Sequence, residues 1–379
     1  MSILPRKIYM PKEMNYALLI VNGHLQDPPG DLNWPLFVNL CKRHRFIPHL
    51  FEHGEQIKQF FPPGVVQDLE KDYRIHTLYH LGVVREMVKL KRLLDQNEVK
   101  CLFFKGPVLS IQLYGHLNGR YYRDLDVLVQ GNQLDRVLDL VKKEGCEIVK
   151  PGFELSKKQK IFMFERANQF TIRDPRSGIY IEIHWRPFNN KYLFPFEFND
   201  LYEESIKVEL PGTTVETFSN WHNFLFQCCH GASHRWFRLM WLKDVAELYR
   251  EISISKDIVE DLNLSKIVNQ SLALAQIFFH LNPKIDINGN DNLVKGALKG
   301  IFLEDEKLKS IGETKLSNIF YQLGLKEDIK YKIQCLKPFL PHYDDWKLVK
   351  IPDKLFFLYF PLRPLIHVYK ILRGKIGNR

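Results

Sequence analysis

The stretch Tyr121-Tyr122-Arg123-Asp124-Leu125-Asp126-Val127-Leu128-Val129 decides the fold of this chain. Aliphatic residues at every second position from Leu125 onward alternate with two acids, which predicts a β-strand with one buried face. Aspartate is a poor strand former, so Asp124 and Asp126 on the opposite face indicate a function. Carboxylates about 7 Å apart along a strand suit a hard cation such as Mg²⁺, which prefers oxygen ligands. The Asp-x-Asp pattern alone is a weak signal, and its surroundings strengthen it.

A second predicted strand, residues 100–104, runs directly into Lys105-Gly106-Pro107 and a segment with helical periodicity. Pro107 suits the first helical position, and Gly106 suits the cap before it. A glycine turn that opens a helix presents free backbone N–H groups to a phosphate, and Lys105 adds a mobile cation. Taken alone, these residues also fit an ordinary strand-turn-helix corner.

A hairpin is predicted from residues 170–173 and 179–185, because Pro and Gly in the connection are typical of turns. In the second strand Tyr180, Glu182 and His184 share a face opposite three isoleucines. Glu182 alone fits a solvated strand residue. Together with the aspartate pair it is the expected third ligand of a two-metal phosphoryl-transfer site. Trp185 points to the other face and is expected in the core.

These motifs resemble those of the DNA polymerase β superfamily of nucleotidyltransferases. Within it the chain is similar to a branch of largely uncharacterised bacterial proteins, the NTP-transferase-5 type. The core counterparts here are Phe104-Lys105-Gly106, Arg120, Asp124-Leu125-Asp126 and Glu182-Ile183-His184-Trp185. The outer counterparts are the N-terminal helical signature Leu40-Cys41-Lys42-Arg43-His44-Arg45-Phe46-Ile47-Pro48 and the helix with His230-Gly231-Ala232-Ser233-His234-Arg235-Trp236, Leu239, Trp241, Leu242 and Asp244. The resemblance covers most of the chain.

The resemblance implies an α+β fold, in which helical regions flank a small mixed β-sheet core. It implies an enzyme that moves a nucleoside monophosphate from an NTP to an unidentified acceptor, with Mg²⁺ or alternatively Mn²⁺ as cofactor. The wider superfamily usually has a serine after the turn glycine, whereas Pro107 stands here. The triphosphate would therefore be bound mainly by backbone N–H groups and Lys105. The implied roles are metal binding for Asp124, Asp126 and Glu182, nucleotide binding for Lys105, Gly106, Arg120 and Arg123, and acceptor contact or orientation of Glu182 for His184. Asp126 is expected to be an exposed cleft carboxylate, whose removal leaves the fold intact.

Composition sets wider bounds. With 379 residues, 45% hydrophobic and 26% charged, the chain is typical of a soluble globular protein. A net charge of +10 favours anionic partners such as nucleotides, nucleic acid or an acidic membrane surface. The six cysteines form no C-x-x-C pair, which argues against a zinc ribbon and favours a reducing compartment. No signal-peptide pattern or membrane-spanning run is evident, so we expect a cytoplasmic protein.

Three regions are expected along the chain. Residues 1–97 are helical in pattern, 98–190 alternate strands with helices as the catalytic core, and 191–379 are mostly helical after a strand-like passage at 207–217. Within the core, Asn132 is expected to cap a helix that Gly145 ends.

Two features outside the core have alternative interpretations. His230 and His234 lie four residues apart, so on a helix they share a face, but the glutamate of an H-E-x-x-H protease motif is missing. Packing at a domain interface and a cleft-facing role towards nucleotide or acceptor stay open, and Asp244 is expected to form an ion pair or cap. The apolar and basic tail from residue 355 fits either a weak membrane-surface anchor or packing onto the helical domain.

The alternative function is a non-catalytic protein that retains the fold and binds nucleotide, RNA or a partner through its basic surface. The presence of all three acids speaks against it. An RNA-modifying enzyme is permitted by the charge, but no RNA-binding module is recognisable. A small-molecule, lipid-linked or peptide acceptor is favoured over RNA, and the sequence does not name it.

Overall fold

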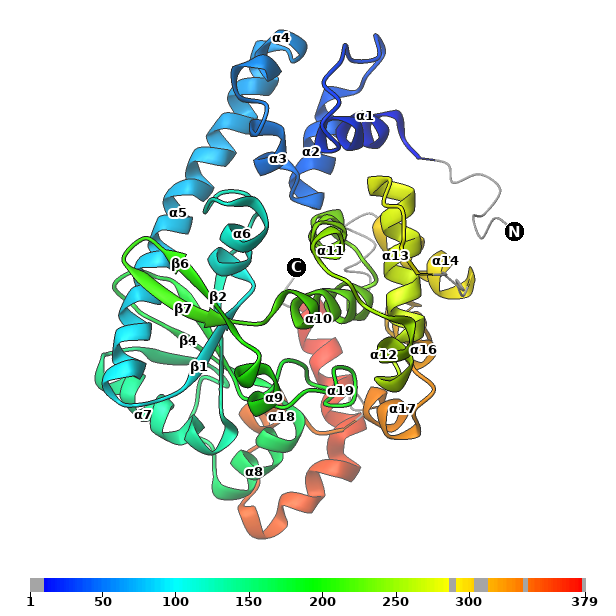
Figure 1. The fold of residues 1–379 in the computed structure, drawn as a ribbon. Helices are drawn as coiled ribbons and strands as arrows, with labels where there is room; N and C mark the ends of the chain where they lie inside the picture. Colours follow the sequence, from blue (N-terminus) through cyan, green and yellow to red (C-terminus); the bar gives the residue numbers. More distant parts are fainter. Residues whose placement is uncertain (1–9, 286–290, 303–312, 337–339, 377–379) are drawn as a thin grey trace.

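A mixed five-stranded β-sheet lies beside a group of helices in this α+β protein (Figure 1). The computed structural model describes residues 10–285, 291–302, 313–336 and 340–376. Its strands are β1 (Cys101–Phe104), β2 (Asp124–Val129), β3 (Glu147–Lys150), β4 (Gln169–Arg173), β5 (Tyr180–His184), β6 (Ile206–Leu210) and β7 (Thr213–Thr217). The large sheet has the order β1-β2-β5-β4-β3, and β6 and β7 form a second, two-stranded sheet.

Helices surround the large sheet. The described α-helices are α1 (Lys12–Val21), α2 (Trp34–His44), α3 (Ile47–Phe51), α4 (Ile57–Phe60), α5 (Pro63–Gln96), α6 (Gly106–Tyr114), α7 (Leu134–Lys143), α8 (Lys157–Arg166), α9 (Phe198–Glu203), α10 (Asn220–Ser233), α11 (Leu239–Glu251), α12 (Lys256–Asp261), α13 (Ser265–Phe279), α14 (Asp291–Phe302), α16 (Glu313–Gly324), α17 (Ile329–Cys335), α18 (Tyr343–Leu348) and α19 (Tyr359–Ile376). Short 3₁₀ helices cover Gly54–Gln56, Gly131–Gln133 and Asp353–Leu358. In the part of the chain that the structure describes, no helix has the length and apolar character needed to cross a membrane.

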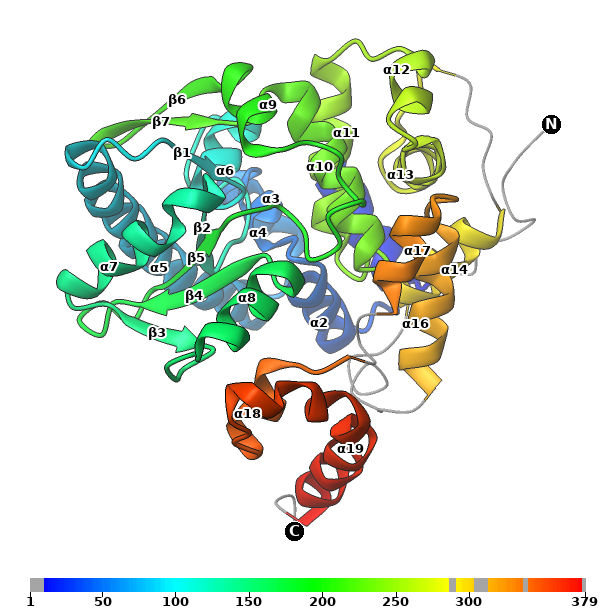
Figure 2. The ribbon, with the colours of Figure 1, turned by 90° about the horizontal axis from the view of Figure 1, so that it is seen from below.

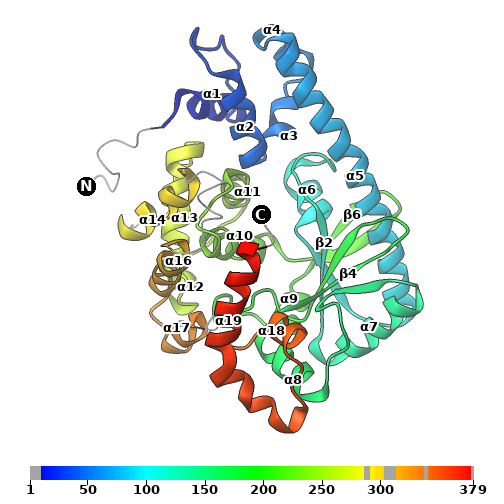
Figure 3. The same cartoon turned by 180° about the vertical axis from the view of Figure 1, so that it is seen from behind.

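The two faces of the sheet pack against different helices (Figures 1 and 3). Leu125, Val127 and the isoleucines of β5 face one hydrophobic cluster, which contains apolar residues of α5 and α7. Phe104 and Leu128 belong to a larger cluster on the other face, together with α10, α11 and α13. Because side chains alternate along a strand, the acids of β2 point towards this second, helix-rich side.

The predicted hairpin is confirmed: β4 and β5 pair in antiparallel register, with Thr171 opposite Glu182. Two details of the predicted helix starts are wrong. The helix after β1 begins at Gly106 with Lys105 as its N-cap, one residue earlier than expected. Asn132 lies inside a 3₁₀ turn, so α7 begins at Leu134 without a side-chain cap.

The C-terminal tail lies on the side of the molecule that carries α8 (Figure 2). It packs against α8 and joins the hydrophobic cluster of the large sheet, so the predicted packing onto the helical domain is wrong. Phe356 is buried, and its ring lies 5.3 Å from that of Phe162 on α8. The backbone N–H of Lys158 donates to Asp353 at 3.1 Å. The outer side of the tail leaves Phe357 61% exposed, and contact of this side with a membrane stays a prediction.

Candidate functional site

Three carboxylates gather on one face of two adjacent strands. β2 and β5 run parallel, and their register places Asp126 beside Glu182 and Asp124 beside Tyr180. Residues that are directly paired lie on the same face of a sheet, so Asp124, Asp126 and Glu182 share one face. The strands and the shared face predicted from the sequence are therefore confirmed.

Asp126 is the centre of this group. It is only 2% exposed, so the expectation of an exposed cleft carboxylate is wrong. Its Oδ1 accepts hydrogen bonds from Lys105 Nζ at 2.7 Å and from His184 Nε2 at 3.0 Å. Burial acts to raise the pKa of Asp126, but Lys105 and His184 outweigh it and lower that pKa. Asp126 is thus an ionised, buried carboxylate, and two donors fix its orientation.

His184 is oriented by Asn168, a residue that the sequence analysis missed. The Asn168 amide nitrogen donates to His184 Nδ1 at 3.1 Å and to the Pro187 carbonyl at 3.2 Å. The carbonyl fixes which end of the amide faces the ring, so Nδ1 accepts and Nε2 carries the proton. Burial lowers the pKa of His184, but the hydrogen bond to Asp126 and the nearby Glu182 carboxylate, 3.6 Å away, leave it raised overall. No local sequence pattern marks Asn168, which lies just before β4.

Lys105 occupies an unusual backbone position at the start of α6. Its φ is 58° and its ψ −149°, a region that residues with a side chain rarely adopt. Gly106 follows with φ 44°, and an added Cβ there would lie 3.5 Å from the Asp124 carbonyl oxygen. Burial lowers the pKa of Lys105, but Asp126, Glu182 and Asp124 raise it overall. The expectation of a mobile cation is wrong, because the ammonium group is held against Asp126.

The donor set fits a hard divalent cation. Ligand atoms of Asp126, Glu182 and His184 all lie within 4.8 Å of one another, whereas Asp124 is outside this group. Burial, followed by the charges of Asp126 and Glu182, raises the pKa of Asp124 to about 6. Among the described residues, Lys105 and His184 pair with Asp126 at 2.7 and 3.0 Å, and His184 lies 3.6 Å from Glu182, so the three carboxylates outnumber the basic groups paired with them. Since His184 Nε2 donates to Asp126, the available ligands are mainly oxygens, as Mg²⁺ requires.

Arg120 lies in a buried ion pair instead of facing the acids. Its Nε and Nη2 donate to Asp244 Oδ2 at 3.2 and 2.9 Å, and Tyr114 donates to Oδ1 of the same carboxylate at 2.9 Å. The ion-pair interpretation of Asp244 is confirmed. Arg123 is exposed beside Tyr121. Nucleotide contact by Arg120 and Arg123 stays a prediction.

His230 and His234 lie within electrostatic reach of Lys105. Their ring centroids are 4.8 Å apart, and the His230 ring is 4.7 Å from that of Trp241. His230 is in α10, whereas His234 is the residue that caps its C-terminus. His234 is an exposed residue. Surrounding protein atoms remove part of its hydration, and together with the charges of Lys105 and Arg238 they lower its pKa to about 4. The influence of Lys105 favours the cleft-facing interpretation.

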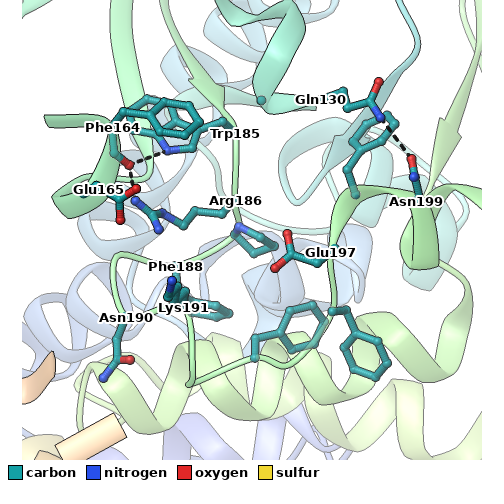
Figure 4. A pocket seen from close by; sticks show the side chains of 15 residues that line it. Gln130, Phe164, Glu165, Trp185, Arg186, Phe188, Asn190, Lys191, Glu197 and Asn199 are labelled. Carbon is teal, nitrogen blue, oxygen red and sulfur yellow. Dashed lines mark hydrogen bonds between the residues drawn. The ribbon is translucent and has the colours of Figure 1, made fainter. Parts of the chain in front are cut away.

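A cavity of about 360 Å³ lies at the C-terminal ends of β2 and β5 (Figure 4). Its wall includes Trp185 and Arg186, which both donate to the Phe164 carbonyl, and Gln130, which donates to Asn199. None of the three acids lines it. It is therefore separate from the acid cluster.

Comparison with known proteins agrees with this geometry. Residues 30–280 match the family described as "Uncharacterised nucleotidyltransferase". The chain belongs to this family. The crystal structure of an antigenic nucleotidyltransferase-like protein from Paracoccidioides brasiliensis aligns at a TM-score of 0.32 and 14% identity, covering 59% of this chain and 92% of that one. No curated protein matches the sequence. The resemblance drawn from the motifs is confirmed, and family membership supports nucleotidyl transfer as the general activity of this nucleotidyltransferase.

Proposed function

We propose that this nucleotidyltransferase moves a nucleoside monophosphate from an NTP to an acceptor nucleophile with Mg²⁺, or Mn²⁺, as cofactor. The observation that carries the proposal is the placement of Asp124, Asp126 and Glu182 on one face of two parallel strands. The N-terminus of α6, with Lys105 as its cap, lies next to them. Carboxylates beside a helix N-terminus combine a metal site with a phosphate site.

Asp124, Asp126 and Glu182 would hold the metal, which when bound supplies charge neutralisation at the phosphates and the attacking oxygen. The raised pKa of Asp124 is consistent with this assignment, because burial and then the charges of Asp126 and Glu182 disfavour its ionised form, which a bound cation would stabilise. His184 supports it indirectly by fixing the orientation of Asp126.

The remaining steps are carried by the protein's own groups. Backbone N–H groups in the first turn of α6 and the Lys105 ammonium group bind the negatively charged triphosphate and stabilise the departing pyrophosphate. The Glu182 side chain is 20% exposed, against 2% for Asp126, so it is the more reachable of the two. We assign to a Glu182 carboxylate oxygen the removal of the proton from the acceptor nucleophile.

The proposal is tested with labelled NTPs and purified protein. Pyrophosphate release and label transfer are followed with Mg²⁺, Mn²⁺ or EDTA, using water, RNA, peptides and small molecules as acceptors. We expect metal-dependent turnover, and a loss of at least ~10³-fold in Asp126→Asn and in Glu182→Gln. The control Glu209→Gln changes an exposed carboxylate on β6 and should keep full activity. A folded wild-type protein that releases no pyrophosphate from any of the four NTPs would overturn the proposal.

Calorimetry distinguishes the enzyme from a protein that only binds anions. An enzyme of this type binds NTP together with Mg²⁺, and this binding requires the acids. A basic binding protein holds NTP without metal, and removing acids tightens that binding. Equal or tighter NTP binding in Asp124→Asn, independent of Mg²⁺, would favour the binding protein.

A further inference from the structure

A third cavity, of about 720 Å³, lies where the N-terminal helices meet the residues before β2 and the start of α11. We call it the arginine pocket. Within the described chain no Asp or Glu lines it. Its cationic lining residues are Lys42, Arg43, Arg45, Arg123 and Arg238. Such a concentration of one charge attracts anions.

Two of these cations, Arg45 and Arg123, have no carboxylate partner within 4.0 Å among the described residues. Both lie against Tyr121 instead, with guanidinium carbons 4.8 and 5.6 Å from its ring centroid. Lys42, in contrast, pairs with Asp68 at 3.1 Å. Arg45 and Arg123 thus flank one aromatic ring, and Arg43 and Arg238 add to the positive charge of the pocket.

Arg45 occupies its position at a cost. It ends α2 with φ 61° and ψ 40°, the left-handed conformation in which glycine is usually found. Burial, followed by the charges of Arg238, Arg120 and Arg123, lowers the pKa of Arg45 to about 9. Backbone strain and repulsion among like charges both disfavour an arginine here. A bound anion would offset the repulsion.

The arginine pocket adjoins the acid cluster. Tyr121 and Arg123 immediately precede Asp124 in the chain, and the charge of Arg45 acts on the Asp124 carboxylate. The charges of Arg238 and Lys105 both lower the pKa of His234, so this residue is within electrostatic reach of the pocket and of the cap of α6. A molecule in the pocket would reach the metal-binding acids from the Asp124 side.

The pocket also has apolar walls, which include Met14, Leu40, Phe237 and Phe302. A triphosphate group is entirely polar and charged, so it gains nothing from contact with an apolar wall. Lys105 and the N-terminus of α6 provide a separate site for it. We propose that the arginine pocket binds the acceptor substrate, holding a phosphate-type anionic group on Arg45 and Arg123 and an apolar portion on the adjoining wall. This inference rests on the proposed function, since it names the chemical class of the acceptor, and it assigns Arg123 to the acceptor in place of the nucleotide contact predicted from the sequence.

Phenyl phosphate combines the two features and serves as the probe, with phenol as its neutral counterpart. Binding is measured by calorimetry, with and without a saturating α,β-methylene analogue of ATP and Mg²⁺. We expect phenyl phosphate to bind in both conditions and phenol to bind at least tenfold more weakly. Arg45→Gln and Arg123→Gln should each weaken phenyl phosphate binding by about tenfold or more, while affinity for the nucleotide analogue stays within about threefold.

The matched control is Arg92→Gln/Arg136→Gln, which removes two exposed arginines on α5 and α7 and should change neither affinity. Arg123 is exposed, so its variant carries the test even if Arg45→Gln does not fold. Displacement of phenyl phosphate by the nucleotide analogue, or an equal loss of nucleotide affinity in the arginine variants, would show that the pocket holds the nucleotide's phosphates. Either result, or no binding of phenyl phosphate to the wild type, overturns the inference. Failure of the proposed function appears separately, as nucleotide binding that does not depend on metal or on Asp126.

Discussion

Replacing Asp124 by asparagine should stabilise the protein in the absence of divalent cations. Burial and the neighbouring carboxylates raise the pKa of Asp124 from 3.8 to about 6. Between about pH 4 and pH 6 the folded protein keeps a proton that the unfolded chain has already released. The wild type therefore loses stability as the pH rises through this range, and the loss is complete above the folded pKa. Asparagine carries no such proton and avoids the loss.

The magnitude follows from the shift. About two pKa units correspond to about 3 kcal/mol, and partial solvent access of the side chain reduces the expected value to about 1–3 kcal/mol. At pH 8 without divalent cations, Asp124→Asn should exceed the wild type by this amount. For a chain of 379 residues unfolding as one unit, the melting temperature should rise by about 1–4 °C.

The assay is thermal and urea unfolding from pH 4 to pH 8 in EDTA, for the wild type, Asp124→Asn and the control Asp139→Asn. Asp139 is an exposed residue of α7, so its variant should follow the wild-type curve. Adding Mg²⁺ should stabilise the wild type by ligand linkage and stabilise Asp124→Asn much less. A stability difference that does not change between pH 4 and pH 8, or a variant that is less stable at pH 8, would refute this account of Asp124.

The other predictions concern single contacts. Asp126→Asn should have the opposite effect on stability, a loss of about 1–3 kcal/mol in EDTA measured by urea unfolding, because two buried donors lose their shared charged acceptor. Asp244→Asn should cost about 3–5 kcal/mol by leaving Arg120 buried without its partner, and a cycle with Arg120→Met/Asp244→Asn should show that the two effects are not additive. Anionic vesicles should bind the wild type weakly and bind Phe357→Ser/Leu365→Ser less, as measured by co-sedimentation; equal binding by both proteins would exclude a contact through these exposed residues of the C-terminal tail.

The sequence predicts the strands of the site well, because their signal is local. The period-two pattern of β2 and β5 places Asp126 and Glu182 on the polar face of each strand, and the parallel register then brings them together. The burial of Asp126 is a different matter. The pattern identifies the face of a strand, but it does not identify what covers that face. In this protein α10 and its neighbours cover it.

Contacts between residues far apart in the sequence are not predicted either, because a local pattern does not show which elements pack together. Arg120 and Asp244 are 124 residues apart, and each fits several roles until the packing of α6 against α11 is known. Asn168 orients His184 across two strands, and amide side chains are too common near strand ends to indicate such a role. Arg45 belongs to a segment that the family resemblance had marked, but its position beside Tyr121 depends on how α2 packs.

Two residues at positive φ argue that the charges around the acid cluster serve function more than stability. Lys105 and Arg45 both adopt backbone conformations that glycine would occupy with less strain, and both place a cation where it acts on Asp124. Strain of this kind costs about 1–3 kcal/mol per residue, while Arg45 also faces repulsion from three other arginines. Cations at these positions suit the proposed reaction between an NTP and an anionic acceptor, because both substrates would bring negative charge to the acid cluster.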